Sequence, residues 1–493
     1  MHSGTETNLN QRKWKKVASF ILAMAGIFCG TSLLFRLFWF DEVLTVSLLL
    51  KLPLEKIYFA YEIPNNHIVF TLLEKIWFTA IASFLPQPPW IFRLPILLTG
   101  GAALFILSRE LLKKYSLYPV CTVCGALAVS SVWAMYSTAI RGYMLGFFLT
   151  VLAWSIMKYY MRGNHPFRDG FLYGVLCLLS VGTLPSNLAA LVGTSLWFLP
   201  EAYRKKAWKK WILSLILPPL ALGIFYLPIL DKFLGCIRLG EGWFSRTNAL
   251  YAMYSGAFFP VAVSAFFAMI AAVIIFRKSR GWVVRFRILC DILILLLPAG
   301  AILLMKTIPF PRVFFPLTVL WICIGVRYLS FWKHLTGKHR VLLWLPLILQ
   351  GIWSTLFFQD RAEYAGNFLY GAGGRGDDYI APYYARTDFK PEKVIRFIRE
   401  QAQNGEEVHF FATFDADAPS LLFAAQLQNL EKGLLYADIL NKPKTLRFDL
   451  LPGEKYIIAN GREDLQRTLA RFKFKEGIPV KKYGLHKIYK VIP

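Results

Sequence analysis

Apolar windows of about 20 residues recur along most of this chain, and they constrain its fold more than any other feature. Each window is long enough for a helix to cross the hydrocarbon core of a bilayer. The chain has 493 residues, of which 56% are hydrophobic and only 17% are charged, whereas soluble domains carry about 25% charged residues. The sequence therefore predicts a polytopic α-helical membrane protein.

The windows predict about eleven transmembrane helices. They lie at residues 17–40, 91–112, 117–138, 143–161, 170–185, 187–202, 211–230, 257–276, 288–305, 312–331 and 341–359. Basic clusters occupy every second connection, from Arg12–Lys16 before the first window to Lys333–Arg340 after the tenth. Because such clusters stay in the cytoplasm, we expect the N-terminus inside and the C-terminus outside. The net charge of +26 is then explained by the basic residues of the cytoplasmic connections, and no nucleic-acid partner is expected.

One further apolar stretch, His67–Leu85, is not counted as a span. A full crossing here would invert every later connection and place the basic clusters outside. We therefore expect residues 41–90 to form one long external loop that contains short interfacial helices.

The composition changes after Phe358, where apolar windows stop and charged residues become frequent. We expect a transmembrane domain over residues 1–359 and a small soluble extracytoplasmic domain over 360–493. Strands alternating with helices are typical of an α/β domain. The predicted elements are a helix at 391–403, a strand at 408–413, a strand at 456–459 and a helix at 463–472.

Polar side chains that could carry chemistry gather on the predicted outer face. Asp41 and Glu42 directly follow the aromatic end of the first window, and carboxylates at such a depth indicate a functional site. The other candidates are Asn66, His67, Arg141, Tyr143, Lys306 and Arg312. A single arginine here is more often a topological or snorkelling cation. Several arginines at one face with a carboxylate favour a phosphate-binding site that also holds a general base.

Several motifs, in order, resemble the family 39 glycosyltransferases. These are protein O-mannosyltransferase-like enzymes of the integral-membrane C-type class, related to the aminoarabinose transferases. The similar stretches are Trp39–Glu42, Asn65–Leu73, Phe92–Pro95, Ala139–Leu145 and Pro311–Pro316. The resemblance covers the first ~150 residues well and the remainder mainly by layout.

The resemblance implies a polyprenyl-phosphate-linked sugar as donor. It assigns Asp41 to the acceptor nucleophile as general base, with Glu42 in support, and it places Arg141 and Arg312 at the donor phosphate. A lipid phosphate leaves as an anion, so it needs charge stabilisation rather than the acid that a glycosidase supplies. We therefore expect one carboxylate to suffice and the anomeric carbon to be inverted.

Other functions remain open from the sequence. A transporter or flippase of a lipid-linked or anionic substrate is the main alternative, although Asp291 lies near the cytoplasmic end of its window and no paired halves are visible. An external domain that recruits partners, or an oligosaccharide ligase, would also fit. The acceptor could be a lipid, a protein or a glycan. No cofactor is certain, and a divalent metal at Asp41 and Glu42 stays open. The layout favours a bacterial inner membrane.

Overall fold

The computed structural model describes residues 3–492 except 32, 36–37, 39, 62–65, 82–88, 164, 240–280, 306–310, 332–389, 404–406, 414–415, 417, 438–445 and 485. The predicted spans at 257–276 and 341–359 and the candidate Lys306 lie outside the described residues. The chain divides into two compact units. We name Met1–Arg36 with Leu52–Tyr384 the helical unit, and Leu37–Lys51 with Ala385–Pro493 the sheet unit.

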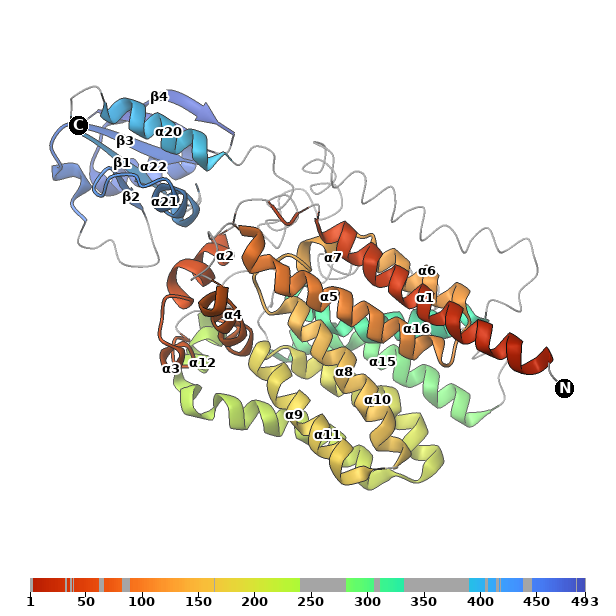
Figure 1. Ribbon diagram of the computed structural model, residues 1–493. Helices are drawn as coiled ribbons and strands as arrows, with labels where there is room; N and C mark the ends of the chain where they lie inside the picture. The colour runs from red at the N-terminus through yellow and green to blue at the C-terminus, as the bar shows by residue number, and fades with distance from the viewer. Residues whose placement is uncertain are drawn as a thin grey trace. The chain divides into compact units, whose positions relative to one another are not determined.

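The helical unit is built around α8 (Figure 1), which packs against α5, α9, α10 and α16. Four segments of the described chain are long and apolar enough to cross a membrane, namely Pro89–Leu112, Tyr143–Arg162, Trp208–Arg238 and Arg312–Ser330. The elements of this unit are α1 (Ser3–Thr31), α3 (Leu54–Ile57), α4 (Ile68–Ile81), α5 (Pro89–Leu112), α6 (Leu117–Ala128), α7 (Ser131–Tyr136), α8 (Tyr143–Arg162), α9 (Pro166–Thr183), α10 (Asn187–Lys205), α11 (Trp208–Tyr226), η2 (Leu227–Ile229), α12 (Leu230–Leu239), α15 (Trp282–Met305), η5 (Pro311–Leu317) and α16 (Thr318–Phe331).

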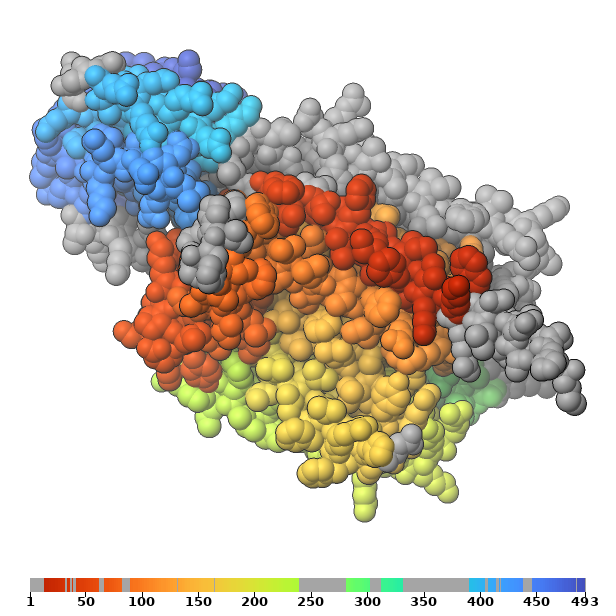
Figure 2. All heavy atoms as spheres, in the orientation of Figure 1, coloured from red at the N-terminus to blue at the C-terminus, as the bar shows by residue number. Residues whose placement is uncertain are grey.

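Small residues bring α1 close to α5. Gly26 and Gly30 stand four residues apart on α1, the spacing that lets two membrane helices approach closely. A Cβ at Gly26 would lie 2.6 Å from Leu104 Cδ1, and one at Gly101 would lie 2.6 Å from Ile27 Cδ1. The opposite face of α1 exposes Phe20, Ile21, Met24 and Phe28, as a lipid-facing surface does. In Figure 2 the side chains of α1 appear in red at the surface of the helical unit.

Two predicted spans differ from the observed helices. The span predicted at 17–40 ends early, because α1 stops at Thr31 and its last carbonyls accept hydrogen bonds from the Leu33 and Leu34 amides. The span predicted at 117–138 is split into α6 and α7. Ser130 causes this break, since its hydroxyl caps α7 by accepting a hydrogen bond of 3.0 Å from the Trp133 amide.

The sheet unit contains a five-stranded mixed sheet of order β2-β1-β3-β5-β4. β1 is parallel to β2 and β3, whereas β5 is antiparallel to β3 and β4. Its elements are α2 (Phe40–Leu44), the π-helical η1 (Thr45–Leu49), α20 (Pro391–Ala402), β1 (Val408–Ala412), α21 (Ala418–Leu427), β2 (Leu435–Ala437), η10 (Phe448–Leu450), β3 (Glu454–Ala459), α22 (Arg462–Phe472), β4 (Glu476–Tyr483) and β5 (His486–Ile492).

Both faces of this sheet are covered, because successive side chains of a strand point to opposite faces. Phe410 of β1 packs with α20 and α21 on one face. The next residue, Phe411, packs with Phe448 and with Phe472 of α22 on the other face. The central strands are therefore apolar at consecutive positions, as in a sheet buried on both sides.

Residues 37–51 belong to the sheet unit although they are distant from it in sequence. α2 packs against α21, and the rings of Phe38 and Phe423 lie 5.2 Å apart. The sequence does not indicate this association, since the contact joins segments almost 400 residues apart.

The elements predicted in this region agree with the structure within two residues: α20, β1, β3 and α22 occupy the expected segments. Strands β2, β4 and β5 and helix α21 were not predicted. The sequence pattern does not predict β4 and β5, because their lysines interrupt the alternation of apolar residues.

The backbone at Gly453 leads to a prediction about the stability of the sheet unit. Its φ is +75°, and a Cβ there would lie 1.9 Å from the Glu407 carbonyl oxygen, beside the bond from the Glu454 amide that starts the β1–β3 ladder. We expect Gly453→Ala to destabilise this sheet by roughly 3 kcal/mol. Faster hydrogen exchange at the β1 and β3 amides of the full-length protein would show it. Gly461→Ala is the control, because Gly461 has open space for a Cβ, and equal exchange in both variants would contradict the prediction.

Candidate active site

Asn66 fixes the entry to α4 and thereby the position of His67. Its amide nitrogen donates to the Ile57 carbonyl at 2.8 Å and to the Ala60 carbonyl at 2.9 Å. Its amide oxygen accepts a hydrogen bond of 3.0 Å from the Thr71 hydroxyl. With its amide used on both sides, Asn66 ties the end of α3 to the start of α4.

The connection between α7 and α8 approaches the His67 ring. The Gly142 amide donates to His67 Nδ1 at 2.7 Å. A Cβ at Gly142 would lie 2.7 Å from Thr183 Cγ2 and 2.8 Å from His67 Nδ1. Glycine is therefore required here by space, since any side chain would push the backbone donor away from the ring.

The bond from Gly142 decides which His67 nitrogen carries the proton. A neutral imidazole has one donor and one acceptor nitrogen. Since the backbone amide of Gly142 can only donate, Nδ1 accepts and the proton lies on Nε2. Arg141 Nη2 is 3.1 Å from this Nε2, and a guanidinium also only donates. Two donors thus face each other, an arrangement that an anionic oxygen beside the pair, accepting from both, would satisfy.

Arg312 reaches the same cluster from η5. Its Nε donates to the Tyr143 hydroxyl at 2.9 Å, and the Tyr143 ring lies edge-on to His67 with 5.1 Å between centroids. η5 is held in place because the Ser186 hydroxyl donates to the Val313 carbonyl at 2.8 Å. The buried Phe315 ring stacks on Phe147 at 5.2 Å.

The cluster concentrates positive charge in a buried place. Arg141 is 3% exposed and Arg312 is 9% exposed, and arginine stays charged in proteins. Burial holds the pKa of His67 well below its usual range, and the guanidinium groups of Arg141 and Arg312 lower it further. His67 is therefore a neutral donor beside two fixed cations.

Five of the residues expected from the sequence thus lie in the helical unit: Asn66, His67, Arg141, Tyr143 and Arg312. Asp41 and Glu42 belong to the sheet unit. Asp41 is half-buried in the first turn of α2, where its carbonyl accepts a hydrogen bond of 3.0 Å from the Thr45 hydroxyl. Glu42 is fully buried. Within the described residues, no three His, Cys, Asp or Glu side chains are grouped as a metal site would require.

Sequence reasoning missed the contribution of Gly142, which acts through its backbone amide rather than a side chain. A glycine inside the Arg141–Tyr143 stretch was a usable signal, because glycine permits close backbone approach. Tyr61 was also missed. It is buried and lies within electrostatic range of Arg141, and nothing in the sequence around it indicates this.

His67 makes a prediction about pH. The unfolded chain protonates His67 near its ordinary pKa of 6.5, whereas the folded protein does so only at much lower pH. The neutral form of His67 therefore contributes its full stability above the ordinary pKa of 6.5. As the pH falls below 6.5, the unfolded chain takes up the proton first, and stability is lost by about 1.4 kcal/mol per pH unit. Thermal unfolding of the wild type and of His67→Gln, each at pH 7.5 and roughly one to two units lower, should show the steeper loss in the wild type. Equal pH slopes would rule this out.

Comparison with known proteins identifies structural relatives only. No family model and no curated protein sequence matches the chain. Among solved structures, ArnT from Cupriavidus metallidurans bound to undecaprenyl phosphate matches with a TM-score of 0.51 and 12% identity, over 96% of this chain and 97% of that one. The apo form of the same protein matches with a TM-score of 0.47 and 12% identity, over 99% and 98% of the two chains.

The apo oligosaccharyltransferase of Archaeoglobus fulgidus matches with a TM-score of 0.48 and 11% identity, over 91% of this chain and 69% of that one. The match with a TM-score of 0.51 confirms the fold expected from the sequence motifs: this integral membrane chain has the fold of the C-type glycosyltransferases.

Proposed function

We propose that this protein is a membrane glycosyltransferase that moves a sugar from a polyprenyl-phosphate donor to an acceptor hydroxyl or amine. The observation that carries the proposal is the buried group of His67, Arg141 and Arg312 on a C-type fold. The structural relative with this fold is described as bound to undecaprenyl phosphate, an anion of the class that such a group would hold.

In this proposal Arg141 and Arg312 hold the donor phosphate, and His67 Nε2–H adds a neutral donor. Arginine binds phosphate through two parallel hydrogen bonds. Negative charge grows on the phosphate oxygen as the bond to the anomeric carbon breaks, and donors already fixed in a buried site stabilise that charge without reorganising. Tyr143 orients Arg312, and Asn66 positions His67. Lys306 remains a proposed donor-side cation.

Asp41 is proposed as the general base and Glu42 as its support. The acceptor oxygen or nitrogen attacks the anomeric carbon from the side opposite the phosphate, and its proton passes to the Asp41 carboxylate. The bond from the anomeric carbon to the phosphate oxygen breaks, and polyprenyl phosphate leaves as the anion. A single displacement of this kind inverts the anomeric carbon, and it uses no acid on the leaving group.

The proposed setting is a bacterial inner membrane. The basic connections favour a cytoplasmic N-terminus, so the donor site, Asp41 and the sheet unit are proposed to work on the extracytoplasmic side. A lipid, a protein side chain or a glycan would each offer a suitable hydroxyl or amine as acceptor.

Asp41→Asn tests the base. We expect the rate of polyprenyl phosphate release from donor and acceptor in proteoliposomes to fall by about 10²- to 10⁴-fold, the usual contribution of a general base. Asp231→Asn, the same change at an exposed position of α12, should leave the rate unaltered. Near-normal turnover in Asp41→Asn would end the assignment. Movement of intact donor across the bilayer with no bond cleavage in the wild type would instead favour the flippase alternative.

Arg312→Ala tests the phosphate role. A hydrogen bond to a charged group contributes about 1.5–3 kcal/mol, so we expect donor affinity to fall by roughly 10- to 100-fold. Arg312→Lys should recover only part of it, because lysine keeps the charge but loses the planar fork. Arg238→Ala removes an exposed arginine of α12 and serves as the matched control. Equal donor affinities in Arg312→Ala and Arg238→Ala would argue against phosphate binding.

A further inference from the structure

A second buried polar cluster lies where α16 ends and α15 begins. Arg327 Nη1 contacts both carboxylate oxygens of Asp291, at 2.7 and 2.6 Å, and the Tyr328 hydroxyl donates to Asp291 at 2.8 Å. The Arg327 guanidinium also covers the ring of Trp197 of α10, 3.5 Å from its centroid. These contacts fix the position of the Arg327 guanidinium.

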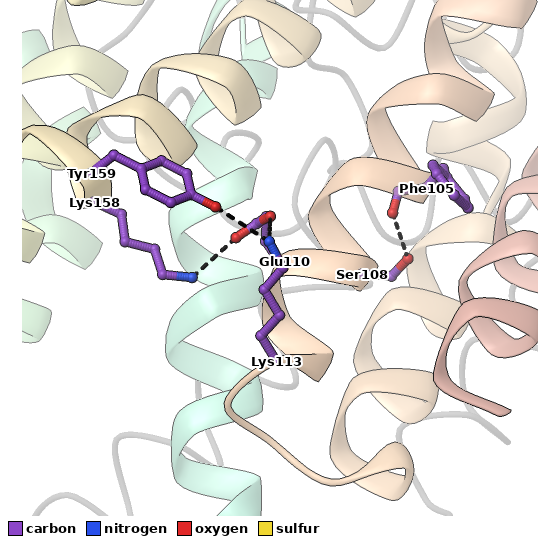
Figure 3. A network of polar contacts seen from close by, with 6 residues as sticks. All are labelled: Phe105, Ser108, Glu110, Lys113, Lys158 and Tyr159. Carbon is purple, nitrogen blue, oxygen red and sulfur yellow. Dashed lines mark hydrogen bonds and ion pairs between the residues drawn. The ribbon is translucent and has the colours of Figure 1, made fainter. Parts of the chain in front are cut away.

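The carboxylates near this cluster are already neutralised by other cations. Glu110 of α5 binds Lys113, and it accepts a hydrogen bond of 3.0 Å from Lys158 of α8, as Figure 3 shows. Glu201 of α10 pairs with Lys205 at 2.8 Å. Asp291 is taken by Arg327. Among the described residues of this region, cations therefore outnumber carboxylates: Glu110, Glu201 and Asp291 stand against Lys113, Lys114, Lys158, Lys205, Arg287 and Arg327.

Lys114 and Arg287 add to this positive charge, although Asp291 lies within electrostatic range of Arg287 and Glu201 within that of Lys114. Arg287 Nε is buried and has no hydrogen-bond partner among the described residues, and Arg287 lies within electrostatic range of Arg327 and Arg204. Lys114 is exposed. Partial desolvation of its ammonium group, with the nearby guanidinium groups of Arg327 and Arg287, lowers its pKa to about 8. Cations that lower one another's pKa values would gain from an anion that all of them could contact.

The cluster lies at the opposite end of the helices from the candidate active site. α8 begins at Tyr143, which binds Arg312, and reaches Lys158 fifteen residues later, a rise of about 22 Å. α16 likewise separates Arg312 from Arg327. This end of the unit also carries exposed aromatic rings at Tyr203, Trp208 and Trp282, of the kind that lie at the headgroup level of a bilayer.

We propose that Lys114 and Arg287 bind the phosphate of an anionic phospholipid headgroup in the leaflet opposite the candidate active site, with Arg327 as a nearby fixed cation. Basic pockets between membrane helices bind anionic headgroups in this way. Free inorganic phosphate offers the same anionic oxygens. The aromatic rings around the cluster and the apolar helices below it favour a ligand with acyl chains.

The test uses full-length protein in phosphatidylcholine nanodiscs that contain a small share of phosphatidylglycerol. Native mass spectrometry measures the phosphatidylglycerol that stays bound on release. We expect retention to fall roughly fivefold for Arg287→Gln and again for the double variant with Lys114→Gln, since each cation near a membrane surface contributes about that factor. Neither variant removes the Asp291–Arg327 ion pair, so the position of Arg327 is preserved.

Two controls make the outcome decisive. Lys209→Gln removes an exposed cation at the start of α11 and should retain phosphatidylglycerol like the wild type, and Arg287→Lys should keep most of the binding if charge is what matters. Retention in the double variant equal to that of the wild type would overturn the proposal. Displacement of phosphatidylglycerol by inorganic phosphate at equal concentration would also overturn it, because the site would then recognise a soluble anion.

Discussion

The hydrogen bond from the Gly142 amide to His67 Nδ1 is the contact on which the candidate active site depends. It is made by backbone, so its direction cannot change, and the space around Gly142 admits no side chain. Because it places the imidazole proton on Nε2, it turns the Arg141–His67 contact into two converging donors. The same connection carries Tyr143, which holds Arg312. One short segment between α7 and α8 therefore sets both the charge and the geometry of the cluster.

Much of this organisation could be predicted from the sequence, because long apolar helices depend on local composition. The windows at 91–112 and 143–161 match α5 and α8 almost to the residue. His67, Arg141, Tyr143 and Arg312 could be singled out because they fall on the predicted outer face, away from the basic clusters, and because their order resembles a known family. The early end of α1 and the break at Ser130 depend instead on hydrogen bonds that apolar composition does not reveal. The association of residues 37–51 with α21 is a long-range contact without a local pattern.

The helical unit places positive charge at both ends of α8 by different means. At the Tyr143 end the two arginines stand beside a neutral imidazole and a phenol. At the Lys158 end carboxylates neutralise part of the charge, and Arg327 is further held against Trp197. The first arrangement suits a transient anion whose charge grows during reaction, and the second suits an anion that stays. Between them α8 carries no charged residue from Met144 to Met157, so each end keeps its own electrostatic environment.

The packing of α2 on α21 has a consequence for how the chain can be divided. The segment that bears Asp41 and Glu42 is built into the same compact unit as the C-terminal strands. Removing or exchanging the last hundred residues would therefore also change the surroundings of Asp41 and Glu42. A change in the packing of α21 would therefore alter the surroundings of α2, the helix that carries Asp41.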